Sequence, residues 1–148
     1  MKKFKKILCP YDFSEYAEEA LLYAIKLADE ETLISVLNII QLPYAIDPNG
    51  FPYFEVTAGE IKSKTEEALH NKIDSLKQKH HELKFDFLIE EGNEPAELIL
   101  KVQRNGGYEI VIMGSHGRKG LGRLLLGSVS ESVLREALCP VLIVKTTK

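Results

Sequence analysis

The sequence lacks the features that mark nucleic-acid-binding, membrane and disulfide-rich proteins. It has no tryptophan and only two cysteines, and its 19 basic and 22 acidic residues leave a formal net charge of −3. Because the basic residues are scattered among acidic ones, no surface is expected to attract nucleic-acid phosphates. The apolar run in the opening segment, MKKFKKILCPYDF, ends at Asp12 and is too short for a secretion signal or a membrane span. We therefore expect a cytoplasmic protein that binds neither nucleic acid nor membrane.

The sequence alternates short β-rich runs with longer helical patterns. Its 148 residues, 45% hydrophobic and 28% charged, are typical of one globular domain, which we expect to span residues 1–148. Strands are predicted over residues 4–10, 32–40, 84–91, 108–114 and 140–145. Helices are predicted over residues 15–29, 60–79, 95–106 and 128–138.

Capping residues support these helices. Ser14 is predicted to cap the first helix, and Ser128 with Glu131 has the spacing of a capping box at the start of the last one. Between the second strand and the second helix, residues 41–59 contain three prolines and four aromatic rings and predict a long surface loop. Two roles are open for this loop: its rings hold it on the surface, or it covers a crevice. The rings are Tyr44, Phe51, Tyr53 and Phe54.

Five strands alternating with four helices predict an α/β fold. Parallel strands joined by right-handed crossovers form a doubly wound sheet with helices on both faces. The expected strand order is 3-2-1-4-5, in which Cys9 lies at the carboxyl end of strand one and Cys139 just before the amino end of strand five. Two cysteines so placed are expected to be free buried thiols, beyond the ~7 Å that separates the Cα atoms of a disulfide.

A glycine-rich loop follows the fourth predicted strand. The stretch GSHGRKGLGRLLLGS, residues 114–128, has five glycines in fifteen positions. In a doubly wound sheet, ligands bind beyond the carboxyl ends of the strands where the winding reverses. This rule brings the glycine loop next to PYDFS, which follows the first strand. Glycines let backbone N–H groups approach an anion, and a helix N-terminus adds further donors, so the loop is predicted to bind phosphates.

Two common phosphate-binding motifs do not fit the loop. Residues 122–128 match the glycine spacing of a Walker A motif, but Ser128 stands where the lysine is required. A dinucleotide fingerprint starting at Gly120 would need a glycine where Leu125 stands. The spacing that does occur is Gly114-x-x-Gly117, then nine residues, then Gly127-Ser128.

This spacing, together with ILCPYDFSE and CPVLIVK, resembles the universal stress protein family, and the glycine pattern resembles its ATP-binding branch. The resemblance covers essentially the whole chain. It implies that ATP, accompanied by Mg²⁺, binds in the crevice, with Asp12 beside the nucleotide and the backbone of Ile39 at the adenine. It also implies a homodimer formed by the C-terminal edge strand. The nucleotide-binding residues are expected to be Pro10, Tyr11, Asp12, Ile39, Met113, Gly114, Gly117, Gly127, Ser128 and Val129.

Simpler roles remain open for these residues. The glycines can serve only turn geometry and packing, Ser128 can act as a helix cap, and Asp12 can act as a turn residue. Nearby polar side chains are expected to stay solvated: His116, Arg118, Lys119 and Arg123. His80 and His81 are expected at an exposed helix end, since no ligand cluster for a metal stands beside them in the sequence.

Three functions are compatible with the sequence. The favoured one is a regulatory protein that holds ATP and acts as a nucleotide-dependent switch. The second is a slow ATP hydrolase, although the motifs contain no recognised base, catalytic lysine or arginine finger. The third is a dimeric scaffold that binds no nucleotide.

Overall fold

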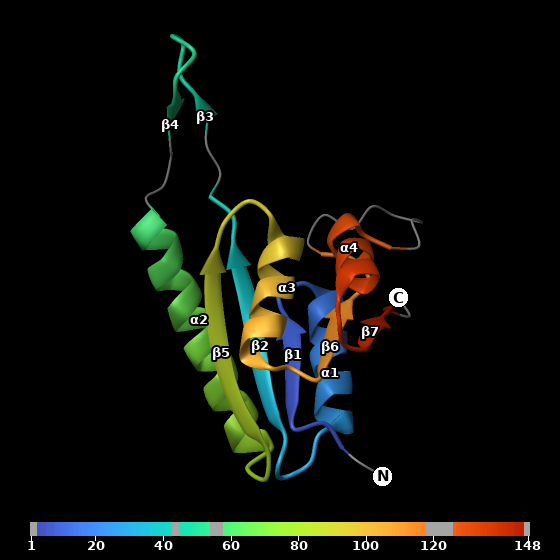
Figure 1. Cartoon of the computed structure of the whole chain (residues 1–148). Coiled ribbons are helices and arrows are strands. Elements are labelled where there is room, and N and C mark those ends of the chain that lie inside the picture. Colours follow the sequence, from blue (N-terminus) through green and yellow to red (C-terminus); the bar gives the residue numbers. More distant parts are fainter. Residues whose placement is uncertain (1–2, 43–44, 54–57, 118–125, 147–148) are drawn as a thin grey trace.

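The computed structural model of the chain describes residues 3–42, 45–53, 58–117 and 126–146. Its centre is a five-stranded sheet in the order β5-β2-β1-β6-β7, in which every neighbouring pair is parallel (Figure 1). If these five strands alone are counted 1 to 5 along the chain, their order across the sheet is 3-2-1-4-5, as predicted. The strands are β1 (Lys6–Pro10), β2 (Leu33–Ile40), β5 (Lys84–Glu91), β6 (Ile110–Gly114) and β7 (Val141–Val144).

Four helices cover the two faces of this sheet. One hydrophobic cluster joins α1 (Glu15–Leu27) and α2 (Ala58–Lys79) to the sheet, and a second cluster joins α3 (Pro95–Gly106) and α4 (Ser128–Glu136) to the opposite face. In β1, Ile7 and Cys9 belong to the first cluster and Leu8 to the second. A central parallel strand is buried on both sides, which explains its continuous apolar sequence.

Helix ends follow the predicted capping rules in two cases. Ser14 precedes α1 with extended backbone, and its hydroxyl oxygen accepts a hydrogen bond from the Ala17 N–H at 3.2 Å. In α3, Pro95 occupies the first turn, and Gly107 ends the helix at φ +65°, a left-handed conformation that glycine adopts without strain. The Ser14 cap fixes where α1 begins, directly after the loop that carries Asp12.

The segment 41–59 differs from the loop that its sequence predicted. It contains a short antiparallel hairpin of β3 (Ala45–Ile46) and β4 (Pro52–Tyr53), and α2 begins at Ala58. Asp47 organises the turn, since its carboxylate accepts from the N–H groups of Asn49 at 2.9 Å and Phe51 at 2.8 Å.

The hairpin projects beyond the β2 and β5 side of the sheet, away from β1 and β6 (Figure 1). The ring of Phe51 is 68% exposed and that of Tyr53 is 46% exposed, so neither ring holds the segment on the surface. Neither proposed role of the segment is therefore supported by the described hairpin. Tyr44 and Phe54 lie outside the described residues.

Candidate functional site

The strand order brings together the carboxyl ends of β1 and β6, where the sequence predicts the ligand site. These strands are neighbours, with Leu8 paired to Val111, so the chain segments that follow them leave the sheet side by side. A Cβ atom at Gly117 would lie 2.7 Å from Oδ2 of Asp12. The first turn of the glycine loop is therefore in direct contact with the loop that follows β1.

A strained turn holds Asp12 at this position. Oδ1 of Asp12 accepts a hydrogen bond from the Ser14 N–H at 3.0 Å, as in an Asx turn. Between them, Phe13 has φ +65°, a left-handed conformation that is unusual for a bulky residue. Such strain persists where surrounding contacts over-determine the backbone, and it is frequent at functional sites.

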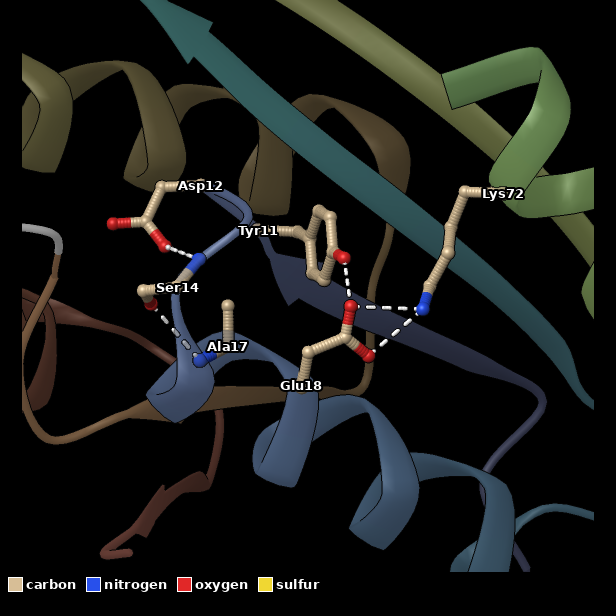
Figure 2. Close-up of polar contacts among 6 residues, drawn as sticks. All are labelled: Tyr11, Asp12, Ser14, Ala17, Glu18 and Lys72. Carbon is tan, nitrogen blue, oxygen red and sulfur yellow. Dashed lines mark hydrogen bonds and ion pairs between the residues drawn. The ribbon is translucent and has the colours of Figure 1, made fainter. Parts of the chain in front are cut away.

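Tyr11 is the best-anchored residue of this loop. Its N–H donates to the Leu37 carbonyl at 2.7 Å, and its carbonyl accepts from Nδ2 of Asn38 at 2.8 Å. Its hydroxyl donates to Glu18, which also binds Lys72 Nζ through both carboxylate oxygens, each at 2.8 Å (Figure 2). Burial, and then the hydrogen bond to Glu18, raise the pKa of Tyr11, so the hydroxyl stays protonated as the donor.

Pro10 and Ile39 lie at the same edge of the sheet. Pro10 is the last residue of β1 and pairs with Leu37, and Ile39 follows two residues later in β2. Ile39 packs against the hydrophobic cluster on the α3 side. Both residues therefore stand near the Asp12 loop; the adenine contact that the family resemblance implies for Ile39 stays a prediction.

Gly114 has a packing role that explains the glycine without any ligand. A Cβ atom there would lie 2.6 Å from Cβ of Tyr16 and 2.8 Å from its carbonyl carbon. Gly114 and Met113 are both buried at the end of β6. The missing side chain at Gly114 thus lets the first turn of α1 approach β6.

The start of α4 is closed onto the end of β6 by two hydrogen bonds. The Gly127 N–H donates to the Ser115 carbonyl at 2.7 Å, and the Ser130 hydroxyl donates to the Gly114 carbonyl at 2.8 Å. The described residues at the two ends of the glycine loop are therefore adjacent in space. Gly127 also has little room, because a Cβ atom there would lie 3.2 Å from the Ser115 carbonyl oxygen.

The predicted capping box at the start of α4 is wrong. Gly127 occupies the cap position and Ser128 is already the first helical residue, because the bond to Ser115 fixes the backbone one residue earlier. In the described part of the chain no side chain caps this helix end, and Glu131 instead binds Arg135 at 2.6 Å. A helix leaves its first N–H groups without internal partners, so those of Ser128 and Val129 face the region of the loop ends.

His116 is half-buried and makes contacts within the site, whereas the sequence predicted a solvated side chain. Its Nδ1 lies 3.1 Å from the Ser115 hydroxyl oxygen, and its ring centroid lies 5.3 Å from that of Tyr16. Its Nε2 is buried and has no hydrogen-bond partner among the described residues. Other residues considered in the loop lie outside the described residues: Arg118, Lys119, Gly120, Gly122, Arg123 and Leu125.

Two comparisons with known proteins identify the family. The sequence profile described as the universal stress protein family matches residues 3–145. The chain belongs to the universal stress protein family. Universal stress protein MJ0577 of Methanocaldococcus jannaschii is 36% identical over 157 aligned residues, which cover 96% of this chain and 95% of that protein. Universal stress protein YxiE of Bacillus subtilis is 30% identical, with 96% and 99% covered.

Solved structures of universal stress proteins have the same fold. The structure of hypothetical protein MJ0577 superposes with a TM-score of 0.76 at 33% identity and covers 99% of each chain. A universal stress protein family protein from Arabidopsis thaliana with AMP bound superposes with a TM-score of 0.61 at 16% identity, covering 97% of this chain and 92% of that one. This second likeness shows the shared fold alone.

Several residues that shape the site of this universal stress protein were not found from the sequence. Glu18 and Lys72 anchor Tyr11, Asn38 holds its carbonyl, and Ser130 binds the end of β6. A signal existed for Glu18, which lies one helical turn beyond the Ser14 cap and so on the same side of α1. The sequence contains no local signal for Lys72, which is 54 residues away from Glu18.

Proposed function

We propose that this universal stress protein holds ATP in the crevice between β1 and β6 and acts as a nucleotide-dependent switch. In this proposal residues 1–148 form a single nucleotide-binding domain that works in the cytoplasm as a homodimer. The observation that carries it is the contact between Gly117 and Asp12, where added side-chain volume would meet a carboxylate at 2.7 Å. Two loops that are distant in sequence thereby form one crevice at the position where doubly wound sheets bind ligands.

The α4 N-terminus is the proposed site of the phosphates. The cap residue Gly127 contributes no side chain, so phosphate oxygens can accept hydrogen bonds from the N–H groups of Ser128 and Val129. The partial positive charge of the helix start favours an anion there. The backbone from Met113 to Gly117 forms the other side of the proposed phosphate site, and the Ser128 hydroxyl is a further donor.

The nucleoside is proposed to lie toward β1 and β2. Pro10, Tyr11 and Ile39 border the crevice on that side, and the backbone of Ile39 is assigned to the adenine. Asp12 is assigned to the middle of the ligand, where a carboxylate can accept hydrogen bonds from ribose hydroxyls. Mg²⁺ would accompany the phosphates and keep several of its waters, as this ion usually does. The AMP-bound Arabidopsis thaliana protein supports the proposal at the level of the fold.

A switch is preferred over an efficient hydrolase because two polar atoms of the described site, one of Asp12 and one of His116, already make structural contacts. Oδ1 of Asp12 binds the Ser14 N–H, and Nδ1 of His116 binds the Ser115 hydroxyl. Efficient phosphoryl transfer requires a group that orients the attacking water and a cation that stabilises the developing charge. We therefore expect the biological signal to come from nucleotide binding and release.

Calorimetric titration with ATP and Mg²⁺ tests the proposal. Gly117→Val is expected to weaken binding about tenfold or more, which corresponds to about 1.4 kcal/mol, because the new side chain displaces Asp12 and fills the crevice. Asp12→Ala is expected to weaken binding less, since it removes one side chain and leaves the backbone donors. Gly59→Val is the matched control, because nothing lies within 4 Å of a Cβ atom at Gly59.

Native mass spectrometry of the purified protein complements the titration, since a retained ATP or ADP identifies ligand and assembly together. A folded Gly117→Val variant that binds ATP like the parent would show that the loop does not hold the phosphates. A parent protein without affinity for adenine nucleotides would support a scaffold instead.

A further inference from the structure

A series of polar contacts connects the proposed nucleotide site to α2. Glu18 of α1 accepts the hydroxyl hydrogen of Tyr11 and binds Lys72 of α2 through both carboxylate oxygens (Figure 2). We propose that Glu18 and Lys72 are positioning residues: they hold Tyr11, and through it Asp12, in the geometry that binds the nucleotide. Through the same contacts, nucleotide binding at the site is coupled to α2. This inference rests on the proposed function.

Tyr11 is suited to transmit the position of Glu18 to the crevice. It is only 4% exposed, and its backbone N–H and carbonyl are both hydrogen-bonded to residues at the end of β2. Its ring packs edge-on against Phe13, with the centroids 4.9 Å apart. A side chain held this tightly moves together with the backbone to which it is attached, and the next residue in the chain is Asp12.

The strained turn explains why an anchor on Tyr11 is needed. Phe13 remains at φ +65° only while its neighbours hold it there. The Asx turn of Asp12 acts within the loop itself, whereas the contacts of Tyr11 tie the loop to two helices and to β2. Loss of the Glu18 anchor would let the turn relax and would move the Asp12 carboxylate away from Gly117.

The Glu18–Lys72 pair differs from the other ion pairs of the described residues. It has two contacts of 2.8 Å and includes a buried tyrosine as a third member. The Lys72 side chain is 26% exposed and the Glu18 side chain 42% exposed. Lys62 of the same helix binds Glu91 at 4.0 Å, with a side chain that is 51% exposed. Short charge-assisted hydrogen bonds are stronger than exposed ion pairs, so the Lys72 contact can fix a geometry that the Lys62 contact cannot.

Coupling between two sites is reciprocal. If the Lys72 contact favours nucleotide binding, then bound nucleotide must favour the Lys72 contact by the same factor. ATP is therefore expected to reduce the local opening of α2 around Lys72. An ion pair with a purely structural role would not make hydrogen exchange around Lys72 depend on ATP.

The test measures ATP affinity in three variants, Tyr11→Phe, Glu18→Gln and Lys72→Met. Each is expected to raise the ATP dissociation constant about fivefold or more, at the lower end of typical coupling between sites. Lys72→Arg, which keeps the charge, is expected to restore part of the affinity. The matched control is Lys62→Met, which removes a lysine from the same helix and is expected to leave ATP affinity unchanged.

Two of these variants separate positioning from a general effect of charge. Glu18→Gln removes a negative charge near an anionic ligand, so a charge effect alone would tighten ATP binding, whereas loss of positioning weakens it. Tyr11→Phe changes no charge. Hydrogen exchange supplies the second readout: ATP should slow exchange around Lys72 in the parent and in Lys62→Met, and should not do so in Lys72→Met.

The outcomes distinguish this inference from the proposed function. A parent that binds no ATP overturns both. A parent that binds ATP, with folded variants that bind it equally well and differ only in melting temperature, overturns the inference alone. Tighter binding by Glu18→Gln would also overturn it.

Discussion

Gly114→Ala is predicted to destabilise the protein because of one close approach between a strand end and a helix. The added methyl group would lie 2.6 Å from Cβ of Tyr16, and 2.8 and 2.9 Å from its carbonyl carbon and oxygen. Real Cβ atoms do not approach other heavy atoms this closely, and the atoms in the way are the Cβ atom and the backbone carbonyl of Tyr16, which cannot move without α1. Relief therefore requires α1 to move, although the Ser14 cap and the hydrophobic cluster hold it in place.

The expected cost follows from the cost of overpacking. Inserting a methylene group into a packed region costs about 1–3 kcal/mol, and a backbone obstacle favours the upper part of this range. A glycine-to-alanine change also lowers the conformational entropy of the unfolded chain, which stabilises the folded protein by about 0.4–1 kcal/mol. The net loss is about 2 kcal/mol, which for a chain of this size lowers the melting temperature by about 4–8 °C.

Thermal and urea unfolding without ligand, followed by circular dichroism, measure this change. Gly117→Ala is the control from the same loop. Gly117 is exposed, its φ is not positive, and the nearest atom to its added methyl group is a side-chain oxygen of Asp12 and not a backbone atom. Its stability should stay within about 0.5 kcal/mol of the parent. A Gly114→Ala variant that melts with the parent would show that α1 does not depend on this close approach.

Four further predictions concern the thiols, the alkaline limit, the assembly and turnover. Both cysteines are free and Cys9 is fully buried. Ellman's reagent should therefore react with Cys139 in the native protein and with Cys9 only after denaturation. Rapid reaction of both thiols in the native protein would contradict this prediction. Burial raises the pKa of the Cys9 thiol from 9.0 to about 12, so the unfolded chain loses this proton at lower pH than the folded protein does. The free energy of unfolding should therefore fall between pH 9 and 12, and it should fall less steeply in Cys9→Ala. The edge strand β7 should pair with a second copy, so light scattering should give a dimer mass for the parent and a monomer mass for Ile143→Lys. Phosphate release from ATP should be slower than about 1 per second, and turnover in the ordinary enzyme range that survives purification would favour a hydrolase.

The sheet could be predicted because its signals are local. The apolar run of β2, the Ser14 cap and the Pro95 start each depend on a few neighbouring residues, and the alternation of strands and helices then restricts the topology. The convergence of Asp12 and Gly117 followed from that topology, since residues after adjacent parallel strands meet at one edge. What each proposed site residue binds stays a prediction.

Other features depend on contacts that the sequence does not reveal. The Glu18–Lys72 pair joins two helices whose rotation about their axes is set by packing, so no spacing rule predicts it. The N-cap of α4 is Gly127 and not Ser128, because the Gly127 N–H donates to the Ser115 carbonyl, a contact that local capping rules do not include. The β3–β4 hairpin had a turn signal in Asp47-Pro48-Asn49-Gly50, but strands of two residues are too short to show alternation.

The central place of β1 has a consequence for how the protein is made. β1 lies between β2 and β6, and Ile7 pairs with Ile110, so about a hundred residues must leave the ribosome before the second side of β1 can be covered. Until then the nascent chain exposes an apolar strand with one unpaired edge, a species prone to aggregation. Gly117 and the start of α4 emerge later still, so the proposed nucleotide site forms only after these early steps. The nascent chain therefore depends on rapid pairing of β1 with β2, or on a chaperone, to protect its first strand.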